Sequence, residues 1–225
     1  YQGVCLPIEK LIRKLQPRFV VVDGAQAFHQ RSVDVARLGC DLYLAGTQKW
    51  FGAFHPLRMV FVARSKNEPA VRSCAAEEFT GAYRDGLFRF FEEAKASSFP
   101  PYGTTVNVSP LVCAAGAMKR AERQAQTHHD LWQVLRTNVQ VFADWMCQLH
   151  WSAVQMHTTL RSGIVGLVPT RDGCKHGGDQ LRHSLASHGV VATAYDDGSL
   201  RFSMPRTYLS LHQLSEVSRA LQMLR

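Results

Sequence analysis

Apolar residues in the first third of the chain recur in short runs separated by amphipathic stretches. Residues 7–15 and 33–38 have apolar positions at helical spacing, which predicts two short helices. Continuous apolar runs predict strands at 19–22, 41–45 and 58–63. Apolar strands that alternate with helices are typical of a parallel sheet covered on both faces. We therefore expect an α/β fold with a mostly parallel sheet and with polar residues at its strand ends.

The middle of the chain contains two segments with different sequence patterns. Residues 66–107 predict mostly irregular structure, because an aromatic-rich piece is followed by Phe-Pro-Pro-Tyr-Gly at 99–103, a turn that blocks helix. Residues 109–149 have helical spacing, begin at a Ser-Pro pair and contain a candidate break at 127–130. This segment is predicted to be a long helical connection, so that residues 1–149 form part of a large domain.

The last third predicts a small C-terminal α/β domain that covers residues 150–225. The sequence Asp-Asp-Gly at 196–198 favours a hairpin turn, and Gly189 is placed to end a helix. The expected elements, in chain order, are a strand, a helix, two further strands and a final helix, at 163–168, 178–187, 190–193, 200–203 and 210–224.

Composition and charge narrow the class of protein. The chain has 225 residues, of which 46% are hydrophobic and 20% charged, as in ordinary globular proteins. No apolar run approaches the roughly 18 residues of a membrane helix, so no membrane association is expected. The net charge is +8. Because Lys and Arg are spread along the chain without a basic stripe, the charge suits an enzyme of anionic cofactors or a subunit with an acidic partner better than a nucleic-acid-binding protein.

The six cysteines contain no CxxC pair and do not cluster with histidines. This spacing predicts neither a zinc site nor a disulfide framework, so free thiols are expected and no metal is assigned. Residues 1–7 do not have the composition of a signal or transit peptide. We therefore expect a cytoplasmic protein.

An acid and a lysine follow two of the predicted strands. Asp23 comes directly after the Val-Val-Val run at 20–22, and Lys49 follows the apolar run at 41–45 in the sequence Gly-Thr-Gln-Lys-Trp. Ligands of open α/β sheets bind beyond the carboxyl ends of the strands. Asp23 and Lys49 are therefore expected to face one crevice and to meet one ligand.

The surrounding sequence resembles the class V aminotransferase family of fold-type I pyridoxal-phosphate (PLP) enzymes, which includes the cysteine desulfurases. The resemblance rests on Asp-Gly-Ala-Gln at 23–26 and on the Gly-Cys-Asp segment at 39–41 that precedes Lys49. It implies that Lys49 forms a Schiff base with the cofactor, that Asp23 pairs with the pyridinium nitrogen and that Gln26 lies near the phenolic oxygen. It also implies the PLP-dependent transferase fold, of which this chain would form the C-terminal portion.

The chemistry of PLP gives separate reasons for these residue types. A carboxylate beside the ring nitrogen keeps that nitrogen protonated, so that the ring can act as an electron sink. A lysine must be partly neutral to attack an aldehyde, and a partly buried site beside a cationic ring favours the neutral amine. We expect such a site for Lys49, because Trp50 and Phe51 follow it. The alternatives are that Asp23 only caps a turn and that Lys49 is an ordinary surface lysine.

The segment Gly-Thr-Thr-Val-Asn at 103–107 resembles the family's Gly-Thr-x-Asn segment. In that family the Thr reaches across a dimer interface to the cofactor phosphate of the neighbouring subunit. Gly103 and Thr104, or alternatively Thr105, are thus candidate phosphate ligands, and a dimer is implied. Small hydroxyl residues and exposed backbone N–H groups suit a phosphate, although Gly-Thr-Thr taken alone is only a turn.

Beside the lysine the resemblance is weaker. Desulfurase-like relatives have a Ser three residues before the lysine and a His directly before it, and this chain has Gly46 and Gln48 there. We expect Thr47 and Gln48 to supply part of the phosphate contact. The usual Gly-Pro-x-Gly turn is replaced by the sequence at 52–58, whose His and Arg face the site or form a structural turn.

Arg201 lies in the sequence Leu-Arg-Phe-Ser at 200–203, which is similar to the Leu-Arg-Ile-Ser strand near the C-terminus of the family. Its planar guanidinium matches a carboxylate in a bidentate manner, so the resemblance implies that Arg201 holds the α-carboxylate of the substrate. The alternative is a strand arginine in a surface ion pair.

The resulting functional expectation is a PLP-dependent enzyme that acts on an amino acid or amine, with transamination first and elimination, epimerisation or decarboxylation as further reactions. Sulfur transfer is less favoured, because the sequence at 180–197 contains no cysteine that could act as the nucleophile, although Cys174 lies upstream. A non-catalytic subunit that keeps the fold is the alternative from another class. No GxGxxG motif supports a Rossmann dehydrogenase.

Members of the family are nearly twice as long as this chain, and their first half carries a phosphate-binding loop and a residue that stacks on the cofactor ring. Neither is found in residues 1–225. We therefore expect a fragment of a longer protein or a split enzyme whose partner chain supplies the N-terminal half, as a homodimer or a hetero-oligomer. Alone, the chain should expose sheet edges and apolar surface.

Overall fold

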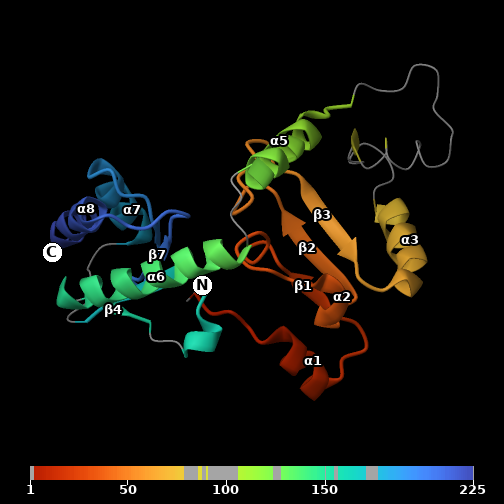
Figure 1. Ribbon diagram of the computed structural model, residues 1–225, viewed down its shortest axis with the longest axis horizontal. Coiled ribbons are helices and arrows are strands. Elements are labelled where there is room, and N and C mark those ends of the chain that lie inside the picture. Colours follow the sequence, from red (N-terminus) through yellow and green to blue (C-terminus); the bar gives the residue numbers. More distant parts are fainter. Residues whose placement is uncertain are drawn as a thin grey trace. The chain divides into compact units, whose positions relative to one another are not determined.

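The computed structural model describes residues 3–78, 86–87, 90, 106–123, 128–149, 151–154, 157–170 and 177–224. The chain forms two compact units. One unit is Ile8–Gln126, and the other combines Tyr1–Pro7 with Thr127–Arg225. Each unit contains its own sheet, with three strands in the first and four in the second among the described residues (Figure 1).

The sheet of the first unit has the strand order β1-β2-β3. Its strands are β1 (Val21–Asp23), β2 (Leu42–Gly46) and β3 (Arg58–Val62). All three lie in the predicted segments. β1 and β2 are parallel, but β2 and β3 are antiparallel. The expectation of a mostly parallel sheet is therefore wrong for the described strands, because the connection at 47–57 has no helix and a parallel partner needs a crossover of about a dozen residues or more.

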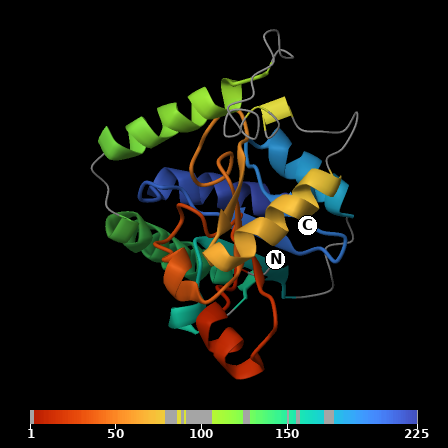
Figure 2. The ribbon, with the colours of Figure 1, turned by 90° about the vertical axis from the view of Figure 1, so that its right-hand side faces the viewer.

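The helices of this unit with described bounds include α1 (Ile8–Leu15), α2 (Val35–Leu38), α3 (Glu68–Glu78) and α5 (Ser109–Arg123). Three were predicted, but α3 falls in a segment that was expected to be irregular. Its local signals are Pro69 in the first turn and the ion pair between Arg72 and Glu68, at 2.8 Å. In both views α3 lies on the β3 side of the sheet, and α1 and α5 lie at opposite ends of its strands (Figures 1 and 2).

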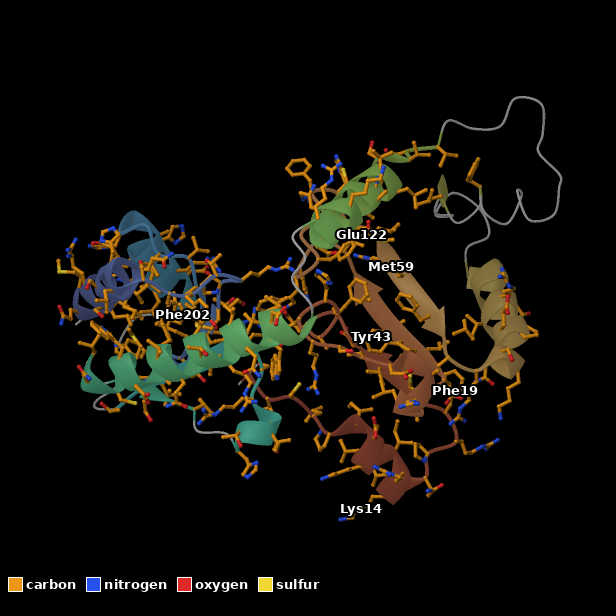
Figure 3. All side chains as sticks on the ribbon, viewed as in Figure 1. Lys14, Phe19, Tyr43, Met59, Glu122 and Phe202 are labelled. Carbon is orange, nitrogen blue, oxygen red and sulfur yellow. The ribbon has the colours of Figure 1, made fainter. Side chains whose placement is uncertain are left out.

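The core of this unit centres on three buried residues of β2 and the segment before it, Cys40, Tyr43 and Ala45. Tyr43 and Met59 belong to neighbouring strands and pack in this core (Figure 3). The sheet was expected to be covered on both faces, but apolar side chains at its margins are exposed. The exposed fractions are 51% for Phe19, 51% for Val21 and 55% for Val60.

The second unit has an antiparallel sheet with the order β4-β5-β7-β6. Its strands are β4 (Trp151–Ala153), β5 (Ile164–Pro169), β6 (Thr193–Ala194) and β7 (Leu200–Ser203). β5 and β7 confirm the prediction, whereas β4 was missed and β6 pairs later than the segment 190–193. The predicted Asp-Asp-Gly hairpin is confirmed: Tyr195 N–H donates to the Ser199 carbonyl at 3.0 Å, and Gly198 has a φ of 79°.

The described helices of the second unit are α6 (His128–Met146), α7 (Gly178–Ser187) and α8 (Leu211–Gln222). α6 contacts β4, β5 and α8. Within this packing, the rings of Phe142 on α6 and Phe202 on β7 are 5.0 Å apart. The two compact units divide the chain at 7/8 and at 126/127, whereas the sequence predicted a single boundary near residue 149. Among the described residues, no helix is both long and apolar enough to cross a membrane.

Candidate functional site

Two turns leave the first sheet at the same edge. β1 ends at Asp23, which pairs with Leu44 of the parallel strand β2, and β2 ends two residues later at Gly46. Gly24 N–H continues the ladder by donating to the Leu44 carbonyl at 2.8 Å. Because parallel strands point the same way, the segments after Asp23 and after Gly46 begin side by side. This is the edge at which open α/β sheets bind ligands.

The first turn, residues 24–31, is stabilised by backbone hydrogen bonds within the turn and packs against the ring of Tyr43. Ala27 N–H and Phe28 N–H both donate to the Gly24 carbonyl at 2.8 Å. The ring of Tyr43 lies so close that a Cβ at position 24 would be 2.0 Å from its Cζ. Only glycine fits there, so Tyr43 sets the path on which the chain leaves Asp23.

Asp23 is exposed and has one carboxylate oxygen engaged. Its Oδ1 accepts the backbone N–H of Ala25 at 2.9 Å. Asp23 therefore caps its turn, as one interpretation of the sequence proposed. This bond leaves Oδ2 without a hydrogen-bond donor among the described residues, so capping and ligand binding are compatible.

Thr47 begins the second turn and closes it. Thr47 N–H donates to the Leu57 carbonyl at 3.0 Å, its Oγ1 accepts Leu57 N–H at 2.9 Å, and its carbonyl accepts Ala53 N–H at 2.9 Å. The residue is only 1% exposed. Thr47 thus fixes both ends of the loop that carries Lys49, a role that the sequence did not reveal, and its contact with a phosphate stays a prediction.

Lys49 is exposed at the tip of this loop, and Gly52 N–H donates to its carbonyl at 3.1 Å. The sequence predicted a partly buried lysine, and in this chain the prediction is wrong, because the apolar neighbours Trp50 and Phe51 turn into the protein and are half-buried instead. No described carboxylate pairs with the Lys49 amine. It is a primary amine presented at the edge where β1 and β2 end.

A side-chain hydrogen bond joins the two turns. Trp50 Nε1 donates to Gln26 Oε1 at 3.0 Å, and the bond is partly buried. Sequence spacing gives no signal for this contact, because it joins residues whose separation depends on the pairing of β1 with β2. It places Gln26 beside the segment that carries Lys49.

An aromatic cluster lies under the same two turns. The ring of Phe51 is 5.6 Å from that of Phe28 and 5.0 Å from that of His29, and Phe28 is 6.2 Å from Phe61 on β3. His29 has a φ of 61°, which is uncommon for a residue other than glycine. Ring packing across the two turns therefore supports the geometry that the Trp50–Gln26 hydrogen bond indicates.

Three of the remaining candidate phosphate ligands, Gly103, Thr104 and Thr105, lie outside the described residues. Gln48 is exposed, and its side-chain oxygen lies 2.6 Å from the position that a Cβ on Gly46 would take. The Gln48 amide therefore occupies the space beside Gly46.

Arg201 belongs to the second unit, on β7. Its Nη2 donates to Thr193 Oγ1 across the β6–β7 pair at 3.1 Å. Its Nε is buried and has no hydrogen-bond partner. No described carboxylate forms an ion pair with Arg201, so the alternative of a surface ion pair receives no support from the described residues. Buried polar atoms normally have a partner, so the unpaired Nε–H remains able to donate a hydrogen bond.

The described thiols differ in their surroundings. Burial raises the pKa of the Cys40 thiol, which is 1% exposed, and thus disfavours its thiolate. Cys147 is exposed, and Cys5 and Cys113 are half-buried. Cys174 lies outside the described residues. Cys40, although next to the candidate site in sequence, has the properties of a core residue and not of a nucleophile.

Comparison with known proteins relates the first quarter of the chain to one family. Residues 1–54 match the family described as "Aminotransferase class-V". A cysteine desulfurase of Wigglesworthia glossinidia brevipalpis is 38% identical over 53 residues, which are 22% of this chain and 13% of the relative.

Solved structures extend the likeness to nearly the whole chain at the level of the fold. An alanine–glyoxylate aminotransferase from Nostoc sp. matches with a TM-score of 0.68 and 15% identity over 99% of this chain and 58% of its own. A cysteine desulfurase from Thermococcus onnurineus NA1 matches with a TM-score of 0.68 and 15% identity over 99% of this chain and 56% of its own. The chain thus spans a little over half the length of these structures. Residues 1–54 of this chain are thus similar in sequence to the class V aminotransferase family and to a cysteine desulfurase, and the α/β fold of the chain is similar to the folds of these solved structures.

Proposed function

We propose that this chain carries the cofactor-anchoring lysine, Lys49, of a PLP-dependent enzyme of the aminotransferase type that acts on an amino acid or amine. The observation that carries the proposal is the juxtaposition of the two turns after the parallel strands β1 and β2, which the Trp50–Gln26 hydrogen bond joins at 3.0 Å. It brings the segment of Asp23 and Gln26 to the segment of Lys49, at the edge where α/β sheets bind ligands.

The side chains on these turns fit the groups of PLP. Asp23 has one carboxylate oxygen that no described donor occupies, and this oxygen can hold a protonated ring nitrogen. Gln26 has its carbonyl oxygen engaged by Trp50, which leaves its NH₂ group to donate to the phenolic oxygen. The Lys49 amine has no described ion-pair partner and can hold the aldehyde carbon of the cofactor.

Bound PLP would supply an electron sink that makes the bonds at the substrate Cα labile. The residues of the chain would control where the proton goes. Lys49 Nζ, in the loop that Thr47 closes, would be the base that takes the proton from Cα and returns it. Asp23 Oδ2 keeps the ring nitrogen protonated.

The phosphate contacts remain proposals. Gln48 is the exposed polar side chain beside Lys49, and Thr47 can contribute through the donor capacity of its hydroxyl. Gly103 and Thr104 are proposed to bind the phosphate of a neighbouring subunit, which makes a homodimer or a hetero-oligomer part of the proposal.

Arg201 is proposed to hold the α-carboxylate of the substrate. Its buried Nε lacks a hydrogen-bond partner, while Thr193 holds the Nη2 end of the guanidinium. A carboxylate would satisfy this nitrogen with a charge-assisted hydrogen bond. The unpaired Nε–H supports this proposal, while the Nη2–Thr193 bond shows that the guanidinium also has a structural contact.

A further polypeptide segment is proposed to cover the free edge of β1, supplied by an N-terminal half or by a partner chain. Among the described residues β1 pairs with β2 alone, and Phe19 and Val21 beside this edge are each 51% exposed. An exposed edge with apolar side chains is a site for further strand pairing or association. The relatives with known structures are longer than this chain, which agrees with such a segment.

A PLP-dependent lyase of the cysteine desulfurase type is the second candidate, and a non-catalytic subunit that keeps the fold is the third. The identity of 38% to a cysteine desulfurase over 53 residues favours the second. The two enzyme candidates differ in their products: amino transfer converts a keto acid to an amino acid, whereas desulfuration of cysteine yields alanine and sulfur. Assaying both with the same preparation decides between them.

The test of the cofactor proposal is covalent trapping. The full chain, with any co-purifying subunit, is incubated with PLP and then with borohydride, and its tryptic peptides are analysed by mass spectrometry. We expect a cofactor absorbance band that borohydride removes and a reduced PLP adduct on the Lys49 peptide. Lys49→Ala should lose both, whereas Lys14→Ala, an exposed lysine of α1 (Figure 3), should keep both. Absence of the band and the adduct in the wild-type assembly would exclude the enzyme and favour the non-catalytic subunit.

A further inference from the structure

The residue after the candidate lysine has a role of its own. We propose that Trp50 is a positioning residue that fixes the orientation of the Gln26 side-chain amide, so that the NH₂ group of Gln26, and not its carbonyl oxygen, faces the cofactor. This inference rests on the proposed function and deepens it, because it assigns to Trp50 control over one hydrogen bond to the bound cofactor.

The chemistry of the indole decides the orientation. The oxygen and nitrogen of a glutamine amide are hard to distinguish by shape alone, and hydrogen-bond partners have to assign them. The Trp50 Nε1–H is a donor only, so its partner atom in Gln26 must be the carbonyl oxygen, at 3.0 Å. The NH₂ group is then turned away from Trp50. No described acceptor occupies it.

Both ends of this hydrogen bond are anchored by backbone contacts. Gln26 lies within the turn in which Ala27 N–H and Phe28 N–H donate to the Gly24 carbonyl. Trp50 lies within the loop that Thr47 closes through Leu57 and Ala53. The Trp50–Gln26 hydrogen bond therefore joins two segments whose backbone paths are also fixed by other hydrogen bonds.

The orientation of the Gln26 amide determines whether the negative charge on the phenolic oxygen of bound PLP is stabilised or destabilised. An NH₂ group that faces the phenolic oxygen stabilises the negative charge on that oxygen, whereas a carbonyl in its place would repel it. Without the indole N–H the amide can rotate and the stabilisation is lost. The absorbance of the bound cofactor, which reports on this ionisation, should then change at a higher pH than in the wild type.

The experiment compares Trp50→Phe with three other variants in the full chain, reconstituted with PLP and with any co-purifying subunit. Trp50→Phe keeps an aromatic ring and removes the donor. Gln26→Ala removes the acceptor, and the double variant combines the two. The matched control is Trp145→Phe, because Trp145 Nε1 donates to Ser218 Oγ at 2.8 Å in the other unit. The titratable residues on and beside the two turns, Asp23, His29, Arg31, Lys49 and His55, are unchanged in all of these variants.

We expect Trp50→Phe to raise the midpoint of the pH-dependent absorbance change by about one pH unit, the order of shift that a hydrogen bond to a charged form causes. Gln26→Ala should raise it by a similar amount, and Trp50→Phe should add nothing in the Gln26→Ala background. Trp145→Phe should leave the midpoint unchanged. A purely structural contribution of Trp50 would add to that of Gln26→Ala and would overturn the inference.

The outcomes separate this inference from the proposed function. A lysine-dependent band in the wild type, with the same midpoint in Trp50→Phe, overturns the role of Trp50 and leaves the PLP enzyme in place. No band in the wild-type assembly overturns both.

A second measurement does not depend on the folding of Trp50→Phe. In the ¹⁵N-labelled protein without cofactor, Gln26→Ala should shift one indole N–H resonance and speed its exchange with solvent, while the other indole resonances stay unchanged. Unshifted indole resonances in Gln26→Ala would contradict the hydrogen bond itself.

Discussion

The ring of Tyr43 lies directly under the backbone of Gly24, so close that a Cβ at position 24 would be 2.0 Å from Tyr43 Cζ. Tyr43 is 2% exposed and belongs to the core of the first unit. A core side chain on β2 thus determines the path of the turn after β1. The position of Asp23 and Gln26 depends on this contact.

Replacing Gly24 by alanine should destabilise the protein, because the new methyl group can be accommodated only if the Tyr43 ring or the turn moves. We expect a loss of about 1–3 kcal/mol in the free energy of unfolding, typical of an overpacked core. Urea denaturation measures it. Gly116→Ala is the control, since its Cβ would meet only Arg120 Nη1 at 3.8 Å on the surface of α5. Equal stability of Gly24→Ala and the wild type would contradict the contact.

Asp41 should be sensitive to an isosteric change, because its buried carboxylate joins three segments. Asp41 is 3% exposed. Its Oδ2 accepts Val20 N–H at 2.7 Å, and its Oδ1 accepts Asn67 Nδ2 at 2.7 Å and lies 3.4 Å from Arg64 Nη1. In Asp41→Asn one donor would face the new NH₂ group. We expect a loss of about 1.5–3 kcal/mol in the free energy of unfolding, the range for hydrogen bonds to charged groups.

The control for this change is Asp179→Asn on α7, whose side chain is 84% exposed and pairs with Arg182 on the surface. An exposed pair of this kind contributes little, so its unfolding curve in urea should match that of the wild type. If Asp41→Asn and Asp179→Asn lost the same free energy of unfolding, the buried hydrogen bonds of Asp41 would stabilise the protein no more than the exposed ion pair of Asp179.

Cys40 should give the protein a stability that decreases at alkaline pH. Burial raises the pKa of its thiol, while its backbone hydrogen bond lowers it by less. The folded protein therefore retains a proton that the unfolded thiol loses, so this contribution is complete below the ordinary thiol pKa and is lost as the pH rises through the raised pKa. Urea unfolding at a series of alkaline pH values should show a smaller decrease in Cys40→Ala than in the wild type.

The exposed Cys147 is the control for this series, because Cys147→Ala should leave the pH dependence unchanged. The same pair of residues can be compared with a thiol-alkylating reagent in the native protein. Cys147 should be modified first. Modification of Cys40 at the same rate would be inconsistent with its burial.

Arg201→Lys should weaken substrate binding if Arg201 holds a carboxylate. Lysine keeps the charge but lacks the planar fork, and it leaves Thr193 Oγ1 without its partner. We expect the KM for the amino-acid substrate to rise by about tenfold, equivalent to ~1.4 kcal/mol, with a smaller change in kcat. Steady-state kinetics measures both constants. Arg219→Lys, at an exposed position of α8, should leave both unchanged, and an unchanged KM in Arg201→Lys would remove the proposed role.

Local sequence pattern predicted most of the described elements, since their signals lie within a few residues of each other. Ser210 and Gln213 form the capping box of α8, and Gly189 follows α7 with a φ of 74°. α3 was missed because its apolar residues do not recur on one face, although Pro69 and the Glu68–Arg72 pair gave local signals. The short β4 carries too few residues for its alternation to stand out.

By itself the sequence determined that Asp23 and Lys49 each follow an apolar run that forms a strand, because apolar runs followed by polar residues can be recognised along the chain. Only the tertiary structure decided that β3 is antiparallel, that α6 packs with the second unit, that Lys49 is exposed, and that Trp50 binds Gln26. These features depend on which strands pair and which faces meet. Pairing and packing involve residues far apart in the sequence, and neither periodicity nor spacing along one segment contains that information.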